Sequence, residues 1–221
     1  LANSAFSSES NLLQAGDIYR SSVEKIAKKL QNIIEPIGEK FGVDFLGFDF
    51  TPAPFVATDC SVVGALEYLT GKPFGSVSSL SAAAFLLSQL DLATFKRAGF
   101  NGLMLPVLED NILAERVAEG TVTIKDLLSY STVCGTGLDT VPLPGDISET
   151  QLQALLLDVA SLAVRLKKPL TARLMPIPGK KAGEMTCFDF PYFTNTRIMS
   201  PQSDGVSGLL DTTDDIDIIA R

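Results

Sequence analysis

The longest hydrophobic pattern in the chain has the period of a helix. Between residues 11 and 40, apolar side chains recur every three or four positions with lysines and glutamates between them; they include Ile18, Val23, Ile26, Leu30, Ile33 and Ile34. Pro36 lies near the end of this pattern, where a proline kinks or breaks a helix. The pattern predicts one long amphipathic helix, which makes up most of an N-terminal unit at residues 1–42.

Shorter helices are predicted from capping residues at their starts and from the residues that end them. Ser61 precedes an apolar segment that Gly71 ends. Ser148 and Gln151 form a capping box before a broad apolar face that runs through Leu166. The helices predicted after the first cover residues 62–70, 82–90, 111–119, 124–131 and 149–166.

Three segments have the pattern of strands. Residues 43–50 alternate with a period of two, residues 102–106 form a short buried run, and residues 170–175 end at Pro176. Because parallel strands return to the same edge through helical crossovers, this order predicts an α/β fold with parallel strands. Three predicted strands are too few for a complete doubly wound sheet. The chain is therefore either a single α/β domain or part of a larger one.

The end of the chain loses this regularity. From residue 177 onward glycine and proline recur without a periodic pattern. Residues 200–221 contain several aspartates and few basic side chains. We expect this segment to be an acidic, exposed and partly irregular tail.

The overall charge limits the class of partner. The 221 residues carry a formal net charge of −8, and the lysines and arginines are scattered. Nucleic-acid binding needs a basic face, so DNA and RNA are not expected as partners. The apolar runs, such as residues 82–87, are far shorter than the roughly 20 residues of a membrane helix. We expect a soluble protein without a membrane partner.

The cysteines and the N-terminus indicate a cellular compartment. Cys60, Cys134 and Cys187 are odd in number, widely spaced and without a Cys-x-x-Cys pair, which suits a reducing environment. The segment that begins at Leu1 has no signal-peptide pattern, so we expect a cytoplasmic location. It also has no initiator methionine, which hints at residues before Leu1.

The chain contains no histidine, and this narrows its chemistry. Ser-His-Asp and Cys-His catalysis and histidine-containing zinc sites are excluded within the chain. Proton transfer would have to use Asp, Glu, Lys, Tyr or Cys. A bound metal would be a hard, oxygen-liganded ion such as Ca²⁺ or Mg²⁺.

Polar residues concentrate in residues 131–146 and after the predicted strands. Sites in parallel α/β folds form at the carboxyl ends of strands, so we expect these residues to converge. The candidates are Cys134 and Asp139 for catalysis, Gly135, Thr136, Gly137, Arg173 and Lys180 for substrate binding, and Asp49, Glu109, Asp139 and Asp146 for a metal. Gly135 and Gly137 would let a ligand approach the backbone. The Gly-Lys-Lys sequence at 179–181 is either a solvated loop, which we favour, or a place that attracts an anion.

Cys134 and the carboxylates have alternative explanations. Cys134 follows a helix C-terminus, where the helix dipole opposes a thiolate unless Lys or Arg from elsewhere lies alongside. It is otherwise a small buried apolar residue. The carboxylates could hold a cation, or each could accept backbone hydrogen bonds and brace a loop. No EF-hand spacing is present.

Several longer segments together carry a family resemblance. They cover residues 48–55, 71–75, 102–110, 133–146, 168–174, 178–180 and 188–192. As a set they resemble the family called domain of unknown function 711, from about residue 40 to the C-terminus. The resemblance implies that the chain is the C-terminal half of a longer protein, whose missing N-terminal half is its partner.

The resemblance also implies an architecture. The family's fold is similar to the pyruvate formate-lyase-like barrel, so this chain would be half of a ten-stranded α/β barrel around a central site. Glycyl-radical enzymes of that superfamily place a glycine in an Arg-Val-x-Gly context near the C-terminus. Gly205 and Gly208 lack that context, so we expect no radical chemistry.

Two classes of function remain open at this stage. One is an enzyme with a thiol- and carboxylate-lined site, dependent on a divalent cation, that acts on a small anionic or carbonyl substrate. The other is a ligand-binding or structural scaffold without catalysis, in which the polar loops brace the fold. Whether the chain forms a homo-oligomer is also open.

Overall fold

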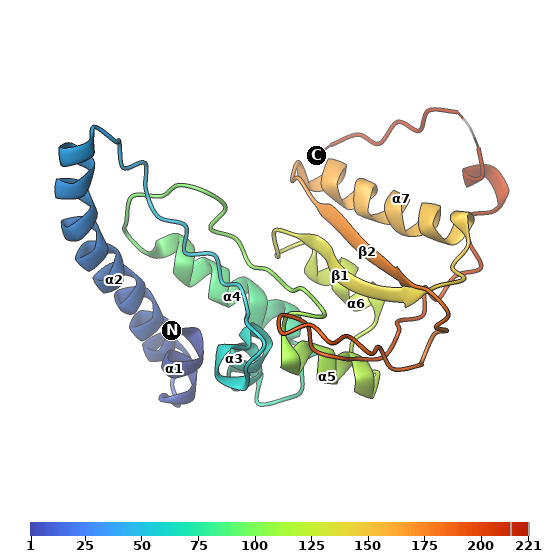
Figure 1. The fold of residues 1–221 in the computed structure, drawn as a ribbon, viewed down its shortest axis with the longest axis horizontal. Coiled ribbons are helices and arrows are strands. Elements are labelled where there is room, and N and C mark those ends of the chain that lie inside the picture. Colours follow the sequence, from blue (N-terminus) through green and yellow to red (C-terminus); the bar gives the residue numbers. More distant parts are fainter. Residues whose placement is uncertain (213, 221) are drawn as a thin grey trace.

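The protein is described by a computed structural model that covers residues 1–212 and 214–220 (Figure 1). Within these residues the chain folds into seven α-helices, two short 3₁₀ helices and two parallel strands. In chain order the elements are α1 (Ala2–Ser7), α2 (Leu12–Phe41), η1 (Thr58–Cys60), α3 (Val62–Thr70), α4 (Ser79–Leu92), α5 (Asn111–Glu119), α6 (Ile124–Tyr130), β1 (Gly137–Pro144), α7 (Glu149–Leu166), β2 (Thr171–Ile177) and η2 (Gly208–Leu210).

The predicted helices are confirmed, several of them with their caps. The side chain of Asn11 accepts from two backbone amides at the start of α2, and this helix continues through Pro36 to Phe41. The hydroxyl of Ser61 accepts from Gly64 N at the start of α3. Ser148 forms the expected capping box at the start of α7. The short helix α1 was missed, because six residues are too few for a recognisable period.

The two strands form one parallel sheet, and α7 is the crossover between them. Strand β2 confirms the strand predicted at 170–175. Strand β1 corrects the expectation of a site loop at 131–146, because residues 137–144 are paired with β2 and buried along their whole length. The glycines and prolines of this stretch gave it the composition of a loop.

The strands predicted at 43–50 and 102–106 are wrong as strands. Within the described residues their backbones make isolated bonds rather than a ladder: Phe48 forms a single bridge with Arg97, and Met104 N donates to Pro52 O at 3.0 Å. Both segments are extended, but only the second lies directly beside β1. On the other side of the second segment, Gly135 N donates to Leu103 O and Val107 N to Asp139 O. The extended segments therefore lie in the order 48–52, 103–107, β1, β2.

This arrangement establishes a mixed α/β fold with a parallel two-stranded sheet. The half of a ten-stranded barrel stays a prediction. Strand β2 has β1 as its one ladder partner among the described residues, and its exposure alternates along the strand. Its outer edge is therefore open.

One hydrophobic core joins the helices to β1. Fully buried side chains from α3, α4, the 103–107 segment, α5 and β1 belong to the same cluster; they include Leu66, Leu86, Leu103, Leu113, Leu138 and Leu143. The tail from residue 200 leaves this core, and Asp214, Asp215 and Asp217 are exposed as expected. No helix among the described residues is long and apolar enough to cross a bilayer.

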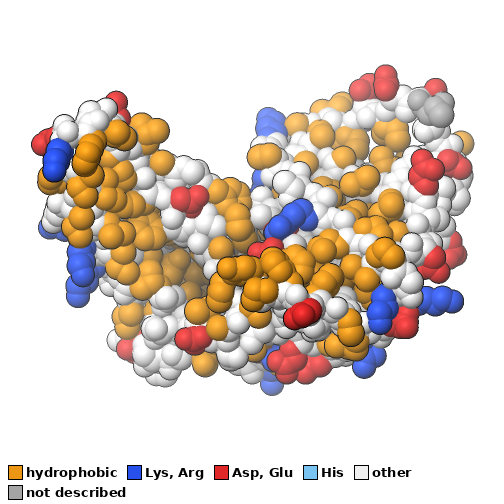
Figure 2. Space-filling view, viewed as in Figure 1, with side chains coloured by type: hydrophobic (Ala, Val, Ile, Leu, Met, Phe, Trp, Pro, Cys, Tyr) orange, Lys and Arg blue, Asp and Glu red, His pale blue; other side chains and the backbone are white. Residues whose placement is uncertain are grey.

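The outer end of α2 projects from this core as an arm (Figure 1). Figure 2 shows the molecule hollowed between this arm and the lobe that contains α7 and the sheet. Hydrophobic side chains gather on the arm and across the face below the hollow.

Candidate functional site

Arg173 on β2 joins two of the predicted carboxylates. Its Nε donates to Asp139 Oδ1 on β1, and its terminal nitrogen Nη2 donates to Glu109 Oε1 at 2.9 Å. Asp139 keeps 4% of its side-chain surface exposed, Glu109 keeps 32%, and Arg173 keeps 55%. Three segments predicted to converge therefore meet at one guanidinium group, which is fixed from one side and open to solvent on the other.

A β-bulge positions Asp139 for this contact. Leu138 pairs with Ala172 and Val141 with Leu174, so two residues of β1 lie opposite Arg173 alone. A bulge turns a side chain away from the regular alternation of a strand, and bulges are common next to functional sites. Asp139 is one of the two bulged residues and the partner of Arg173.

The second bulged residue, Thr140, has an unusual backbone. Its φ angle is 45°, in the left-handed region that β-branched residues rarely adopt. Thr140 is buried, and its hydroxyl accepts from Leu108 N at 3.1 Å, which ties the bulge to the segment that carries Glu109. Strain of this kind persists where the surrounding structure enforces it, and it is concentrated at ligand sites and active sites.

Negative charge exceeds positive charge in the cluster around Arg173. Its hydrogen bond to Asp139 raises the pKa of the guanidinium, burial lowers it, and the charges of Asp139 and Glu109 raise it further, so Arg173 is permanently positive. Two carboxylates surround this one cation, which leaves a local charge of about −1 when both are ionised. Asp139 depends on Arg173 more than Glu109 does, since it is almost fully buried.

Cys134 lies at a different place, near the start of β1. It is buried, and its amide donates to Tyr130 O at 2.7 Å at the end of α6, as the helix-end prediction requires. Lys168 lies close by, with Nζ donating to Ser131 O at 3.0 Å. Burial lowers the pKa of Lys168, while the charge of a Cys134 thiolate would raise it. Lys168 is thus held near Cys134 by its bond to the backbone of Ser131.

Lys168 was not among the predicted site residues. In the sequence, the Lys-Lys-Pro run at 167–169 is already accounted for as the end of α7, because basic residues and proline are usual at helix C-termini. Only the parallel pairing of β1 with β2 brings this lysine next to the segment before β1. No sequence-local signal could have found it.

The two glycines expected to admit a ligand are approached by other parts of the chain. A Cβ atom on Gly135 would lie 1.8 Å from Cζ of Phe100, so this ring occupies the space beside the backbone. A Cβ atom on Gly137 would lie 2.4 Å from Thr171 O, and Gly137 has a φ angle of 84°. Both positions need glycine because the chain itself packs closely there.

Thr136, between these glycines, connects β1 to β2 through its backbone. Its carbonyl accepts from Thr171 N at 2.8 Å and from Thr171 Oγ1 at 2.6 Å. Its own hydroxyl is buried and has no hydrogen-bond partner within the described part of the chain. The backbone of Thr136 therefore has a structural role.

Asp49 braces a loop, as its alternative explanation predicted. Its carboxylate accepts from Thr51 N at 2.9 Å, Phe100 N at 2.9 Å and Asn101 N at 3.0 Å, and also from the Thr51 hydroxyl. Partial burial raises the pKa of Asp49, but the hydrogen bonds outweigh it and lower the pKa to about 2. Asn101 completes the brace, since its side chain accepts from Phe50 N at 3.0 Å.

The last two candidates, Asp146 and Lys180, lie at the carboxyl end of the sheet. Asp146 is exposed in the turn after β1. Lys180 is half-buried, and its carbonyl accepts from Gly145 N at 2.9 Å. These backbone contacts bring the two residues into neighbouring turns, apart from the Arg173 contacts described above.

The four carboxylates proposed for a metal are therefore not gathered at one point. Glu109 and Asp139 share Arg173, whereas Asp49 and Asp146 belong to separate loops. In residues 1–212 and 214–220, no three Asp, Glu, Cys or His side chains are grouped so that they could hold an ion. A Ca²⁺ or Mg²⁺ ion stays a prediction, and in this arrangement Arg173 supplies the positive charge.

Asp110 is a buried carboxylate whose structural role the sequence did not reveal. It caps α5, accepting from Ile112 N and Leu113 N, and it also accepts from Val62 N and Val63 N at the start of α3. The hydroxyl of Ser61 donates to it at 2.6 Å. Asp110 therefore fixes two helix N-termini together directly beside Glu109.

Comparison with known proteins shows which sequences this chain is similar to. A family profile described as Uncharacterised ACR (DUF711) matches residues 2–195. A UPF0210 protein of Pyrobaculum aerophilum is 34% identical over 172 residues, which are 76% of this chain and 38% of that protein. UPF0210 proteins of Methanocaldococcus jannaschii and Leuconostoc mesenteroides are 32% and 30% identical, over 74% and 76% of this chain and 38% and 39% of theirs.

The match extends through the elements that build the site. Residues 2–195 include α1 to α7, both strands, and all three members of the Asp139, Arg173 and Glu109 cluster. The chain spans about two-fifths of the length of the curated relatives it matches. On this match the chain belongs to the family described as Uncharacterised ACR (DUF711).

Proposed function

We propose that this chain binds a small molecule with a carboxylate or carbonyl group, and that Arg173 is the residue that binds it. The observation that carries the proposal is the state of this side chain. Its Nε and Nη2 are fixed by Asp139 and Glu109, while more than half of its surface is exposed. A guanidinium held in this way has little conformational freedom left to lose when a ligand binds. It also offers donors in a planar fork that suits carboxylates.

The unequal charges define how a ligand would bind. A carboxylate ligand meets the negative charge of Glu109, because two carboxylates already surround Arg173. Glu109 is more exposed than Asp139, so it is the partner that a ligand can replace. Asp139 then keeps the guanidinium in place. A neutral carbonyl compound would bind without this competition.

The same geometry provides for proton transfer. A carbonyl oxygen bound to Arg173 would be polarised by the guanidinium, and Glu109 would lie beside it as a carboxylate base. This would be acid–base chemistry without histidine, in agreement with the composition. In this proposal Cys134 and Lys168 support the start of β1 and take no part in the reaction, and no divalent cation is needed.

The alternative function is a scaffold without a ligand. One observation favours it: Phe100 and Thr171 fill the space beside Gly135 and Gly137, where a ligand was expected. Under this alternative the ion pairs of Arg173 would only stabilise the contact between β1, β2 and the turn that carries Glu109. The two functions differ in whether substitutions at Arg173 change binding or only stability.

The experiment is a calorimetric titration of the chain with acetate, oxalate, pyruvate and acetone. We expect the oxo acid to bind, Arg173→Met to abolish binding, and Glu109→Gln to strengthen the binding of anions because it removes the competing charge. Arg20→Met is the matched control, since Arg20 forms an ordinary surface ion pair with Asp17 at 2.6 Å. Circular dichroism of each variant checks that it is folded.

Two results would overturn the proposal. One is that none of these compounds binds to the folded chain. The other is that binding survives in Arg173→Met with unchanged affinity. Either result leaves the scaffold as the supported function.

A further inference from the structure

A cavity of about 400 Å³ lies where the first two helices meet the segment that precedes α3. Its lining comes from α1, from α2 and from two segments between residues 49 and 62. The volume falls within the roughly 300–1,000 Å³ of small-molecule pockets. Arg173, Asp139 and Glu109 are not part of this lining, so the cavity is separate from their cluster.

Tyr19 brings a hydroxyl group without a hydrogen-bond partner to the cavity. This side chain lines the cavity from α2, is 4% exposed, and packs against Phe6 with the ring centroids 5.8 Å apart. Its Oη has no hydrogen bond to residues 1–212 or 214–220, and burial alone raises the pKa of Tyr19 to about 12. Because buried phenol groups usually have a partner, this hydroxyl is available to a ligand.

The charge of the lining is negative. Asp49 and Asp59 belong to it, whereas no lysine or arginine does. Neither carboxylate forms an ion pair within the part of the chain that the structure describes. Asp49 is ionised at neutral pH, since its pKa is about 2. The lining therefore offers negative charge that no basic side chain of the protein neutralises.

We propose that this cavity binds a small primary amine in its ammonium form. Asp59 and Asp49 attract the positive charge, and Tyr19 Oη accepts one of the ammonium protons. Val23 and Phe50 of the lining contact the apolar body of the amine. A carboxylate ligand would be repelled by the same two aspartates. A metal ion suits the lining less well, because no three Asp, Glu, Cys or His side chains among the described residues are grouped to hold one.

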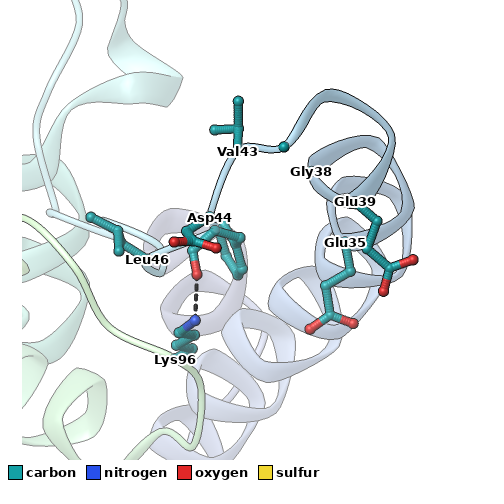
Figure 3. Close-up of a pocket in the computed structure, with 9 residues that line it drawn as sticks. Glu35, Gly38, Glu39, Val43, Asp44, Leu46 and Lys96 are labelled. Atoms are coloured by element: carbon teal, nitrogen blue, oxygen red, sulfur yellow. Dashed lines mark hydrogen bonds between the residues drawn. The ribbon is translucent and has the colours of Figure 1, made fainter.

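A second cavity with carboxylates lacks these features. It has a volume of about 600 Å³ near the end of α2, and its lining includes Glu35, Glu39 and Asp44 (Figure 3). Lys96 belongs to the same lining and supplies a positive charge; its Nζ donates to Phe45 O, as the dashed line in Figure 3 shows. All polar side chains of this lining are exposed. The second cavity therefore provides a matched control for the effect of charge alone.

The experiment is a saturation-transfer NMR titration of the chain with 2-phenylethylamine, and with 2-phenylethanol as a neutral compound of similar shape. Leu1 also lines the cavity, so the chain is used with its α-amino group acetylated, which removes a competing positive charge. We expect the amine to bind at least about tenfold more tightly than the alcohol, because its hydrogen bonds are charge-assisted.

Tyr19→Phe removes the hydroxyl and keeps the ring. We expect it to weaken the binding of 2-phenylethylamine by about tenfold. The melting temperature should stay the same or rise, because the protein loses no hydrogen bond of its own. A hydroxyl with a purely structural role would give the opposite pair of results, which are a lower melting temperature and unchanged binding.

Asp59→Asn tests the charge. It should weaken the binding of 2-phenylethylamine and leave the binding of 2-phenylethanol unchanged. Glu39→Gln, in the cavity of Figure 3, removes the same unit of charge from a protein whose formal net charge is −8. This control should leave the binding of both compounds unchanged.

Three results would overturn the proposal. The first is equal affinity for the amine and the alcohol. The second is unchanged amine binding in both Tyr19→Phe and Asp59→Asn. The third is an equal effect of Glu39→Gln and Asp59→Asn, which would show attraction by the net charge alone. None of these results involves Arg173, so this proposal and the function proposed for Arg173 succeed or fail separately.

Discussion

Ser61 Oγ lies 2.6 Å from Asp110 Oδ1 in the protein interior, and both residues are fully buried. Each begins a helix: Ser61 caps α3 and Asp110 caps α5. Asp110 also accepts two amides of α3, so one carboxylate fixes both N-termini. Because negative charge is favourable at a helix N-terminus, two helix dipoles stabilise the same side chain.

We therefore expect Asp110→Asn to destabilise the protein by about 2–4 kcal/mol, since an amide NH₂ group would point at backbone donors in a buried site. Urea unfolding monitored by circular dichroism measures this change. Asp146→Asn, at an exposed turn, should change the stability by less than about 0.5 kcal/mol. An equal effect of the two substitutions would contradict the role of Asp110.

Asp49 should contribute to the acid sensitivity of the protein. Its pKa in the folded state is about 2, below the ordinary value of 3.8, so its contribution to stability is present above pH 3.8 and lost as the pH falls toward 2. Because Asp49 is exposed, we expect solvent screening to limit this contribution to about 1 kcal/mol or less. Asp49→Asn should weaken the pH dependence between about pH 4 and pH 2, measured as the urea midpoint. An unchanged slope would show that the brace adds no stability.

Gly135 and Phe100 should be energetically coupled. Gly135 is not among the residues with positive φ, so the cost of Gly135→Ala comes from the clash with the Phe100 ring rather than from the backbone. We expect a loss of about 1–3 kcal/mol, typical of an overpacked site. In Phe100→Ala, the same glycine substitution should cost much less, which a double-mutant cycle measures. Additive effects would contradict the contact.

The three cysteines should react at two very different rates. Cys60 and Cys187 are exposed, whereas Cys134 is buried. In a thiol titration of the native protein, we expect two groups to react quickly and the third only when the protein unfolds. Cys134→Ala should cost on the order of 1 kcal/mol, as for a small buried residue. Rapid reaction of Cys134 would instead indicate a thiol activated by Lys168.

The part of the fold that the sequence predicted is the part encoded locally. Capping residues such as Ser61 and Ser148 bond to amides within their own first turn, so the sequence alone shows where those helices begin. Strands depend on partners far along the chain. The segment at 43–50 alternates like a strand, but it forms one bridge rather than a ladder, so its pattern was correct while its pairing could not be predicted.

The candidate site also combines features that the local sequence shows with features that depend on distant parts of the chain. Asp139, Glu109 and Arg173 lie together, but Asp139 and Arg173 meet near the starts of β1 and β2 through strand pairing, not at the carboxyl ends where the rule expects a site. The rule also could not show that an arginine, rather than an ion, lies between the carboxylates. The bulge at Thr140 was also hidden, because it arises from the register with β2 and not from the residues of β1 alone. Glycine content suggested ligand access at Gly135, where an aromatic ring lies instead.

The open outer edge of β2 has a consequence for how the chain behaves at high concentration. An unpaired strand edge can recruit another strand and so begin a fibre. Pro176 lacks one of the backbone donors that such recruitment needs, and it lies near the end of β2. The first half of the strand has no such protection. Self-association through this chain should therefore begin at Thr171 to Leu174, and a proline introduced there on the outward-facing side would suppress it.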